Sequence, residues 1–197
     1  MSNVEYSFDG EMGFGKLKSG LVFDFDRSAF DVIKDINWYV SCQSGRPYLN
    51  DRKGRKLHTY LLNCPSGMEV DHINLDTLDN RLINLRICTH QQNQCNQPPQ
   101  KNNTSGVSGV RWYAPRKKFV ARIKISQHDI HLGYYSTFTE AVQARNVGIE
   151  CMFGEYGRYN DLPPAPAWIR EKVIAQCRRF AELSLCRAFL LSDEIEK

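Results

Sequence analysis

A short segment of the chain, residues 69–93 (EVDHINLDTLDNRLINLRICTHQQN), carries side chains that could do chemistry together. An unperturbed imidazole titrates near pH ~6.5, so His72 can take a proton from water at neutral pH. Asp71 offers an anionic oxygen and Asn93 a neutral one, and such hard oxygens suit one Mg2+ or Mn2+ ion with water completing its shell. A base together with a Lewis-acidic cation is what phosphodiester hydrolysis requires.

These side chains need a frame, and the segment predicts a strand, a loop, a second strand and a helix. MEVDHIN is extended, LDTLDNRLIN is a polar loop and LRICT is a short strand. Thr89 and Gln92 stand three residues apart in a capping-box pattern, so we expect a helix to begin at Thr89. Neighbours on a regular strand point to opposite faces. Asp71 and His72 can therefore share one site only if the strand bends or the phosphate lies across its end.

The segment resembles the HNH endonuclease family, in the variant with Asp-His first and Asn last. The likeness rests on VDHIN at 70–74, DNRLINLR at 79–86 and THQQNQCN at 89–96. It implies a ββα-metal nuclease module with its core at residues 56–97, within a domain of residues 1–98. It also implies a base, a residue that braces the loop and so orients the base, and ligands for one Mg2+ or Mn2+ ion. The expected catalytic residues are His72, Asn84 (the brace) and His90, and the expected metal ligands are Asp71 and Asn93.

Two histidines of this region have roles that the likeness leaves open. His90 is not a ligand in this variant, and it either contacts the scissile phosphate or is simply exposed. His58 falls where relatives often carry His-Arg, but Thr59 follows it here.

A basic block follows the segment. Between residues 100 and 131 there are seven lysines and arginines, Lys101 among them, against the single acid Asp129. This excess indicates a polyanionic partner. GVRWYA, KFVARIKI and DIHLGYYS predict three strands, and TFTEAVQARNVGIECMFG predicts a helix capped at Thr137 or Thr139 and ended by Gly154.

Residues 105–160 resemble the ethylene-response-factor (APETALA-type) DNA-binding domain. The likeness rests on GVRW, KFVARI, HLGYYST, EAVQAR and FGEYGRYN. It implies a three-stranded antiparallel sheet packed on one helix, with its outer face in the DNA major groove. Phe119 and His131 stand where tryptophans are usual, and Arg122 where an acid is usual, so plant sequence specificity is not transferred. Trp112 either covers the sheet or contacts DNA. The expected DNA-binding residues are Arg111, Trp112, Arg116, Lys117, Lys118, Arg122 and Lys124.

The remaining segments predict supporting structure. Residues 1–66 carry short apolar runs at 21, 36 and 56 that favour strands and turns, with a helix near 28–36. Residues 99–104 read as a linker. Residues 161–197 combine a proline-rich linker with a C-terminal helix, which dimerises the chain, contacts DNA or packs on the segment of residues 69–93. Its expected apolar residues are Ile169, Val173, Cys177, Phe180 and Ala181.

The amino-acid composition indicates the broad class to which this protein belongs. A hydrophobic content of 42% and a charged content of 24% are ordinary for a soluble globular protein. The two family resemblances imply an α+β fold. The seven cysteines show no Cys-x-x-Cys pair, so we expect reduced thiols and a cytoplasmic location. The N-terminus does not resemble a signal peptide, and no stretch approaches the ~20 apolar residues of a membrane span.

Three functions follow as hypotheses. The first is a homing-type endonuclease from a phage or mobile element, which cuts double-stranded DNA in the host cell and leaves 5′-phosphate and 3′-hydroxyl ends. The second is a regulatory DNA-binding protein with an inactive nuclease-like module. The third, a structural RNA-binding protein, is weaker because the stacking motifs of RNA modules are absent. The oligomeric state stays open, with a monomer as the simplest expectation.

Overall fold

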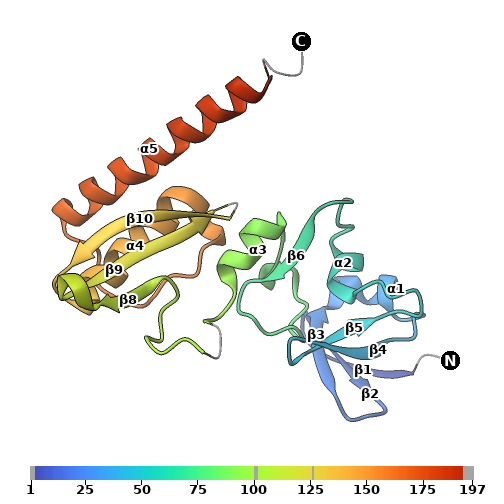
Figure 1. Cartoon of the computed structure of the whole chain (residues 1–197). Coiled ribbons are helices and arrows are strands. Elements are labelled where there is room, and N and C mark those ends of the chain that lie inside the picture. Colours follow the sequence, from blue (N-terminus) through green and yellow to red (C-terminus); the bar gives the residue numbers. More distant parts are fainter. Residues whose placement is uncertain (1–2, 100–101, 126, 193–197) are drawn as a thin grey trace. The chain divides into compact units, whose positions relative to one another are not determined.

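The computed structural model describes residues 3–99, 102–125 and 127–192, with side chains up to residue 183. Lys101 and the rest of residues 100–101, as well as residues 193–197 of the predicted tail, lie outside the described residues. The chain divides into two compact units, Met1–Asn96 and Gln97–Lys197. Both units mix helices and sheets (Figure 1), which confirms the expected α+β class.

The first unit begins with an antiparallel sheet of β1 (Val4–Asp9), β2 (Met12–Leu17) and β3 (Val22–Asp26), in that order. Gly13 and Gly15 on β2 lie opposite Phe25 and Phe23 on β3. A Cβ atom at either glycine would collide with the phenyl ring opposite. The two glycines therefore make room for both rings, which are buried in the core of this unit.

Trp38 completes this core after the sheet ends. The chain passes through η1 (Arg27–Ala29) and α1 (Phe30–Ile33), inside the region expected to be helical. The buried indole donates from Nε1 to the carbonyl of Ile33 at 3.3 Å. Asn3 holds the backbone of Trp38 from both sides, accepting from its N–H at 2.9 Å and donating to its carbonyl at 2.7 Å.

A hairpin of β4 (Tyr39–Gln43) and β5 (Arg46–Asn50) follows, and then α2 (Leu57–Leu61). The apolar run at 56, for which we expected strands and turns, is therefore a short helix. Leu57 is part of the core, and Tyr60 and Leu61 pack against it. Positions three and four apart share one face of a helix, so the helical conformation brings all three side chains to the core.

The segment that carries the candidate residues forms β6 (Glu69–His72), η2 (Leu82–Asn84), β7 (Leu85–Cys88) and α3 (His90–Asn96). This is the predicted order of strand, loop, strand and helix. The predicted cap is present too. The N–H of Gln92 donates to Thr89 Oγ1 at 3.2 Å, and the N–H of Thr89 donates to Gln92 Oε1 at 2.8 Å.

The second unit contains the expected three-stranded antiparallel sheet. Its strands are β8 (Val110–Tyr113), β9 (Lys118–Ile125) and β10 (His128–Tyr135), with β9 in the middle, and η3 (Ala114–Arg116) joins the first two. Helix α4 (Phe138–Phe153) packs on one face of the sheet. Thr137 and Glu140 form its capping box and Gly154 is its C-cap, which confirms Thr137 of the two expected caps. η4 (Gly154–Tyr156) follows.

The C-terminal helix α5 (Ala167–Ser192) belongs to the second unit. Ile169, Val173 and Cys177 are buried in the same core as α4 and the sheet. Phe180 is partly buried against this core, whereas Ala181 is exposed. The helix packs on α4 and the sheet of its own unit, which is none of the three roles considered for it. Within the described residues, no helix is both long enough and apolar enough to cross a bilayer.

Candidate active site

Strand β6 directs its last two side chains to different partners. Asp71 lies directly across from Arg86 on β7, and His72 across from Leu85. The Asp71 carboxylate contacts Arg86 and Asn96, while the His72 ring contacts Asn80, His58 and Tyr48. The alternation expected of a regular strand is therefore kept, and the two side chains have separate surroundings.

His72 is buried, and a hydrogen bond defines which of its nitrogens carries the proton. Its Nε2 lies 3.3 Å from Oδ1 of Asn80. The other end of that amide, Nδ2 of Asn80, donates to the carbonyl of Leu78 at 3.1 Å, so Oδ1 is the atom that faces the ring. An amide oxygen can only accept, so Nε2 is the protonated nitrogen and Nδ1 is the basic one. Burial lowers the pKa of His72 and keeps the ring neutral, although the Asn80 hydrogen bond acts in the opposite direction.

Two more rings surround His72. His58 on α2 meets it edge to face, with ring centroids 4.8 Å apart and planes at 90°. Tyr48 on β5 lies 5.8 Å from the His58 ring and 6.3 Å from the His72 ring. Burial lowers the pKa of His58 to about 3, with lesser contributions from its electrostatic interactions with His72 and Lys56, so this ring is neutral as well. His58, whose role the sequence left open, is thus a neighbour of the expected base.

Asn84 bridges the loop between β6 and β7. Its Oδ1 accepts from the N–H of Asn74 at 2.9 Å, and its Nδ2 donates to the carbonyl of Asp79 at 2.8 Å. Asp79 is in turn held by Arg81 at 2.7 Å. These contacts span the loop that also carries Asn80. Asn84 therefore braces the loop, and no described contact joins its side chain to the His72 ring.

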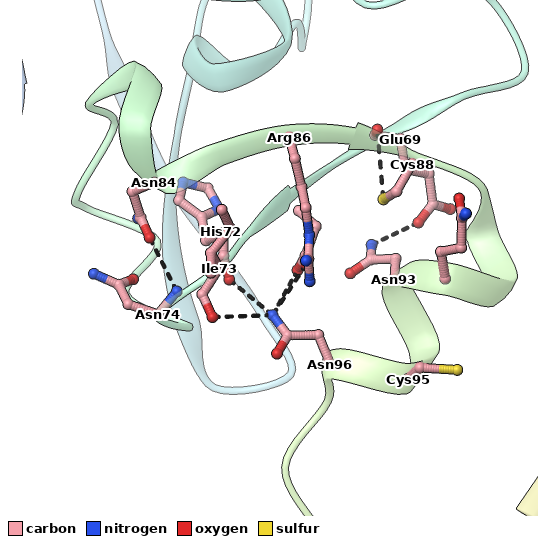
Figure 2. A network of polar contacts seen from close by, with 12 residues as sticks. Glu69, His72, Ile73, Asn74, Asn84, Arg86, Cys88, Asn93, Cys95 and Asn96 are labelled. Atoms are coloured by element: carbon pink, nitrogen blue, oxygen red, sulfur yellow. Dashed lines mark hydrogen bonds and ion pairs between the residues drawn. The ribbon is translucent and has the colours of Figure 1, made fainter. Parts of the chain in front are cut away.

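The Asp71 carboxylate is held from two sides. Arg86 donates to Oδ2 from Nε at 3.0 Å and from its terminal nitrogen at 2.6 Å. Nδ2 of Asn96 lies 3.0–3.1 Å from both carboxylate oxygens and 3.0 and 3.3 Å from the carbonyls of His72 and Ile73 (Figure 2). Asn96 thereby ties the last residue of α3 to the end of β6.

Asn93 and His90 meet on Glu69. Asn93 donates from Nδ2 to Oε2 at 2.6 Å, and His90 Nδ1 lies 2.7 Å from Oε1. Burial raises the pKa of Glu69, but these two contacts outweigh it and hold that pKa below its usual value. Because Asn93 uses its nitrogen here, its amide oxygen is turned away from Glu69, as Figure 2 shows. His90 is exposed.

The donor chemistry of Asp71 and Asn93 fits a hard divalent cation. A carboxylate oxygen and an amide oxygen are both ligands that Mg2+ and Mn2+ accept. Among the described residues, no group of three or more His, Cys, Asp or Glu side chains could hold a metal. A cation at Asp71 and Asn93 would thus use one carboxylate, one amide and water.

Sequence reasoning missed Arg86, Asn96, Asn80 and Tyr48. Asn96 had a partial signal, since it stands three residues after Asn93 and shares a face of α3 with it. Arg86 stands within the quoted DNRLINLR motif. Asn80, which contacts His72 from the loop, stands in the same motif. Tyr48 contacts His72 from β5, and no spacing along the chain indicates that contact.

In the second unit, most of the expected DNA-binding residues share one face of the sheet. Directly paired residues of antiparallel strands project to the same face. Arg122 pairs with His131, Lys124 with Asp129, and Lys118 with Tyr113. The same face carries Arg111 next to Tyr113, and Arg116 lies over the ring of Tyr134 at 4.5 Å. We call this the outer face; its cations are Arg111, Arg116, Lys118, Arg122 and Lys124.

Two expected DNA-binding residues lie elsewhere. Trp112 pairs with Phe119, and their ring centroids are 4.9 Å apart; Phe119 also contacts Phe138 on α4. Trp112 is therefore on the helix side of the sheet, although half of it is exposed. Lys117 stands in the turn after η3 with φ +48°. The one acid of the block, Asp129, forms a 2.9 Å ion pair with Arg122.

Comparison with known proteins places the first unit in a family. A family model described as HNH endonuclease matches residues 63–95. HNH endonuclease L560 of Acanthamoeba polyphaga mimivirus, itself called uncharacterized, is 30% identical over 138 residues, which cover 66% of this chain and 70% of that protein. Protein 3.8 of Escherichia phage T7 is 38% identical over 53 residues, which cover 27% of this chain and 44% of that protein. No solved structure matches the chain significantly. The chain belongs to the HNH endonuclease family.

Proposed function

We propose that this protein is a metal-dependent DNA endonuclease of the homing type, encoded by a phage or mobile element and acting on double-stranded DNA in the host cytoplasm. Its family suggests a nuclease with DNA as substrate, and a phage protein is among its relatives. The observation that supports the proposal is the neutral form and the tautomer of His72. A buried, neutral imidazole with Nε2 tied to Asn80 presents Nδ1 as a base.

His72 would activate the water. Its Nδ1 accepts a proton as the water oxygen attacks phosphorus. The bond to the 3′ oxygen breaks and that oxygen takes a proton from solvent water, which leaves 5′-phosphate and 3′-hydroxyl ends. Because β6 is regular at Asp71 and His72, the phosphate would lie across the end of this strand. Asp71 and the amide oxygen of Asn93 would hold one Mg2+ or Mn2+ ion there. When bound, that ion supplies Lewis-acid stabilisation of the charge that builds on the phosphate and the 3′ oxygen. Asn84 keeps the loop, and with it Asn80, in position.

Plasmid cleavage tests this function. We expect wild type to cut supercoiled plasmid with Mg2+ or Mn2+ and to stop in EDTA. His72→Ala should cut roughly 10²- to 10⁴-fold more slowly, the range that a positioned base contributes. Asn93→Ala should require a higher concentration of Mg2+ or Mn2+ to cut the plasmid. His128→Ala is the matched control, because it removes an exposed histidine of the other unit.

The outcomes separate this function from the second hypothesis. If His72→Ala cuts as fast as wild type, the proposed mechanism is wrong. If the wild type shifts duplex DNA on a gel but never cuts it, the chain is a DNA-binding protein with an inactive nuclease-like module.

The outer face of the second unit is the proposed DNA-recognition surface. Its likeness to an APETALA-type domain is supported by the β8-β9-β10 sheet on α4 and by the cations of the outer face. A sheet that carries arginines and aromatic rings can enter the ~12 Å major groove. We leave Trp112 out of this surface because it packs on Phe119.

A further inference from the structure

The ion pair between Asp71 and Arg86 is largely buried. The Asp71 side chain is 3% exposed and the Arg86 side chain 14%. Nε and one terminal nitrogen of Arg86 donate to the same oxygen, Oδ2, and the two residues are direct partners across β6 and β7. A charge-assisted bond of 2.6 Å is strong, and burial strengthens it because water does not screen it. The guanidinium thus balances the negative charge of Asp71.

This carboxylate is also the proposed ligand for the divalent ion. Mg2+ binds carboxylate oxygens at roughly 2.1 Å. An ion on Oδ2 would stand within about 4.7 Å of the Arg86 nitrogen that lies 2.6 Å from that same oxygen, and two cations repel at that separation. Arg86 and the ion therefore compete for one oxygen.

Asn96 lets Asp71 stay in place when Arg86 leaves. Its Nδ2 contacts both carboxylate oxygens and also the carbonyls of His72 and Ile73, so it is anchored independently of Arg86 (Figure 2). Arginine is long enough to turn toward a phosphate bound at the same ion, and its planar guanidinium matches phosphate oxygens.

We propose that Arg86 occupies the cation position on Asp71 until a divalent ion displaces it, and that the displaced guanidinium then binds the scissile phosphate. This inference rests on the proposed function, because it takes Asp71 as a metal ligand. It makes binding of the ion and of DNA cooperative. The ion frees the guanidinium for DNA, and DNA holds the guanidinium away from the ion.

Mn2+ binding to the full chain, measured by electron paramagnetic resonance without DNA, tests the competition. Arg86→Gln should bind Mn2+ at least tenfold more tightly than wild type, whereas Arg86→Lys, which keeps the charge, should stay within about threefold of wild type. Asp71→Asn should lose the site. Arg55→Gln is the matched control, since Arg55 pairs with Asp51 in the same unit, and it should bind Mn2+ like wild type.

A second set of measurements follows the Arg86 side chain itself and the coupling between the ion and DNA. In wild type, the Nε–H resonance of Arg86 should shift when Mg2+ is added, because its bond to Asp71 is lost. In the His72→Ala background, where duplex DNA stays intact, the DNA should raise Mn2+ affinity tenfold or more. Adding Arg86→Gln to that background should remove this gain.

The results distinguish the inference from the function on which it rests. If Asp71→Asn loses Mn2+ but Arg86→Gln gains no affinity, or if the Arg86 resonance stays unchanged at saturating Mg2+, the inference is overturned and the metal site stands. If Asp71→Asn binds Mn2+ like wild type, the inference and the proposed metal ligands are both overturned.

Discussion

At the scale of single residues, Asn80 determines which nitrogen of His72 is basic. It is almost wholly buried, and both ends of its amide are engaged, by His72 and by the carbonyl of Leu78. A hydrophobic substitute would leave His72 Nε2 without this acceptor, and the other tautomer would become accessible. Asn80 is thus a positioning residue for the proposed base.

We expect Asn80→Leu to cut DNA roughly tenfold to a hundredfold more slowly than wild type, a part of what a general base contributes. Asn80→Asp keeps the acceptor and adds a negative charge, which raises the pKa of His72. The rising limb of its pH–rate profile should therefore move to higher pH. Nitrogen-15 shifts of the His72 ring should show protonated Nε2 in wild type. A protonated Nδ1 there would contradict this assignment.

His58 makes the stability of the first unit depend on pH. The unfolded ring takes up a proton near pH ~6.5, but the folded ring does so only near pH 3. Its contribution to stability is therefore complete above about pH 6.5 and is lost as pH falls toward about 3. In His58→Phe, the free energy of unfolding should change less steeply with pH in this window, by about 1.4 kcal/mol per pH unit.

Hydrogen exchange of Trp38 in the full chain, measured at increasing denaturant concentration, gives the free energy of unfolding of the first unit. Repeating it at several pH values gives the slope. His128→Phe is the control, because it replaces an exposed histidine in the other unit. Equal slopes for His58→Phe and wild type would show that His58 is not buried as a neutral ring.

The residues that could be identified from the sequence have a side chain suited to catalysis or metal binding and also stand at a position of the family motif. Asp71, His72, Asn84 and Asn93 met both conditions, and their functional roles stay predictions. The contacts between His72 and His58, and between Asp71 and Asn96, join residues 14 and 25 positions apart. Such contacts depend on tertiary packing, which no local spacing encodes.

At the scale of elements, the helix starts were the most predictable feature. A capping box uses residues three apart, so the signals at Thr89 and Thr137 are local and the structure contains both boxes. The conformation of the apolar run that begins at residue 56 was less predictable, because it depends on how the run packs against the core. Leu57, Tyr60 and Leu61 reach that core together as a helix.

Thr89→Ala should destabilise the first unit by about 1 kcal/mol, since it removes the cap of the helix that carries Asn93. Thr89→Ser keeps the hydroxyl and should lose little. Hydrogen exchange of the α3 amides in the full chain measures both changes. The cap has no stabilising role if the alanine and serine variants exchange at the same rate.

At the scale of the whole molecule, each unit has its own hydrophobic core. The proposed chemistry belongs to the first unit and the proposed recognition surface to the second. The sheet and helix of the second unit could be predicted from alternating residues and a cap. The sequence predicted that α5 has an apolar face. It did not predict that this face is buried in the core of the second unit, because an amphipathic pattern does not tell which surface the face covers.

Arg122→Ala combined with Lys124→Ala should weaken duplex binding and lower the slope of log affinity against log salt by about 1.8, or ~0.9 for each lost phosphate contact. Fluorescence anisotropy at several salt concentrations measures this slope. Lys16→Ala combined with Lys18→Ala removes two exposed cations from the first unit as a control. An unchanged slope in the Arg122 and Lys124 variant would exclude these residues from the DNA contact.

The strand β3 sets the smallest piece of this chain that can be transplanted to test the proposed nuclease activity. Asp24 accepts from the N–H of Asn80 at 2.8 Å and donates from its own N–H to the carbonyl of Leu78 at 2.9 Å. The loop that aligns His72 is thus an extension of the N-terminal sheet. A fusion enzyme built from the family-matched residues 63–95 would omit this support. An engineered nuclease cassette should instead carry residues 1–96 intact.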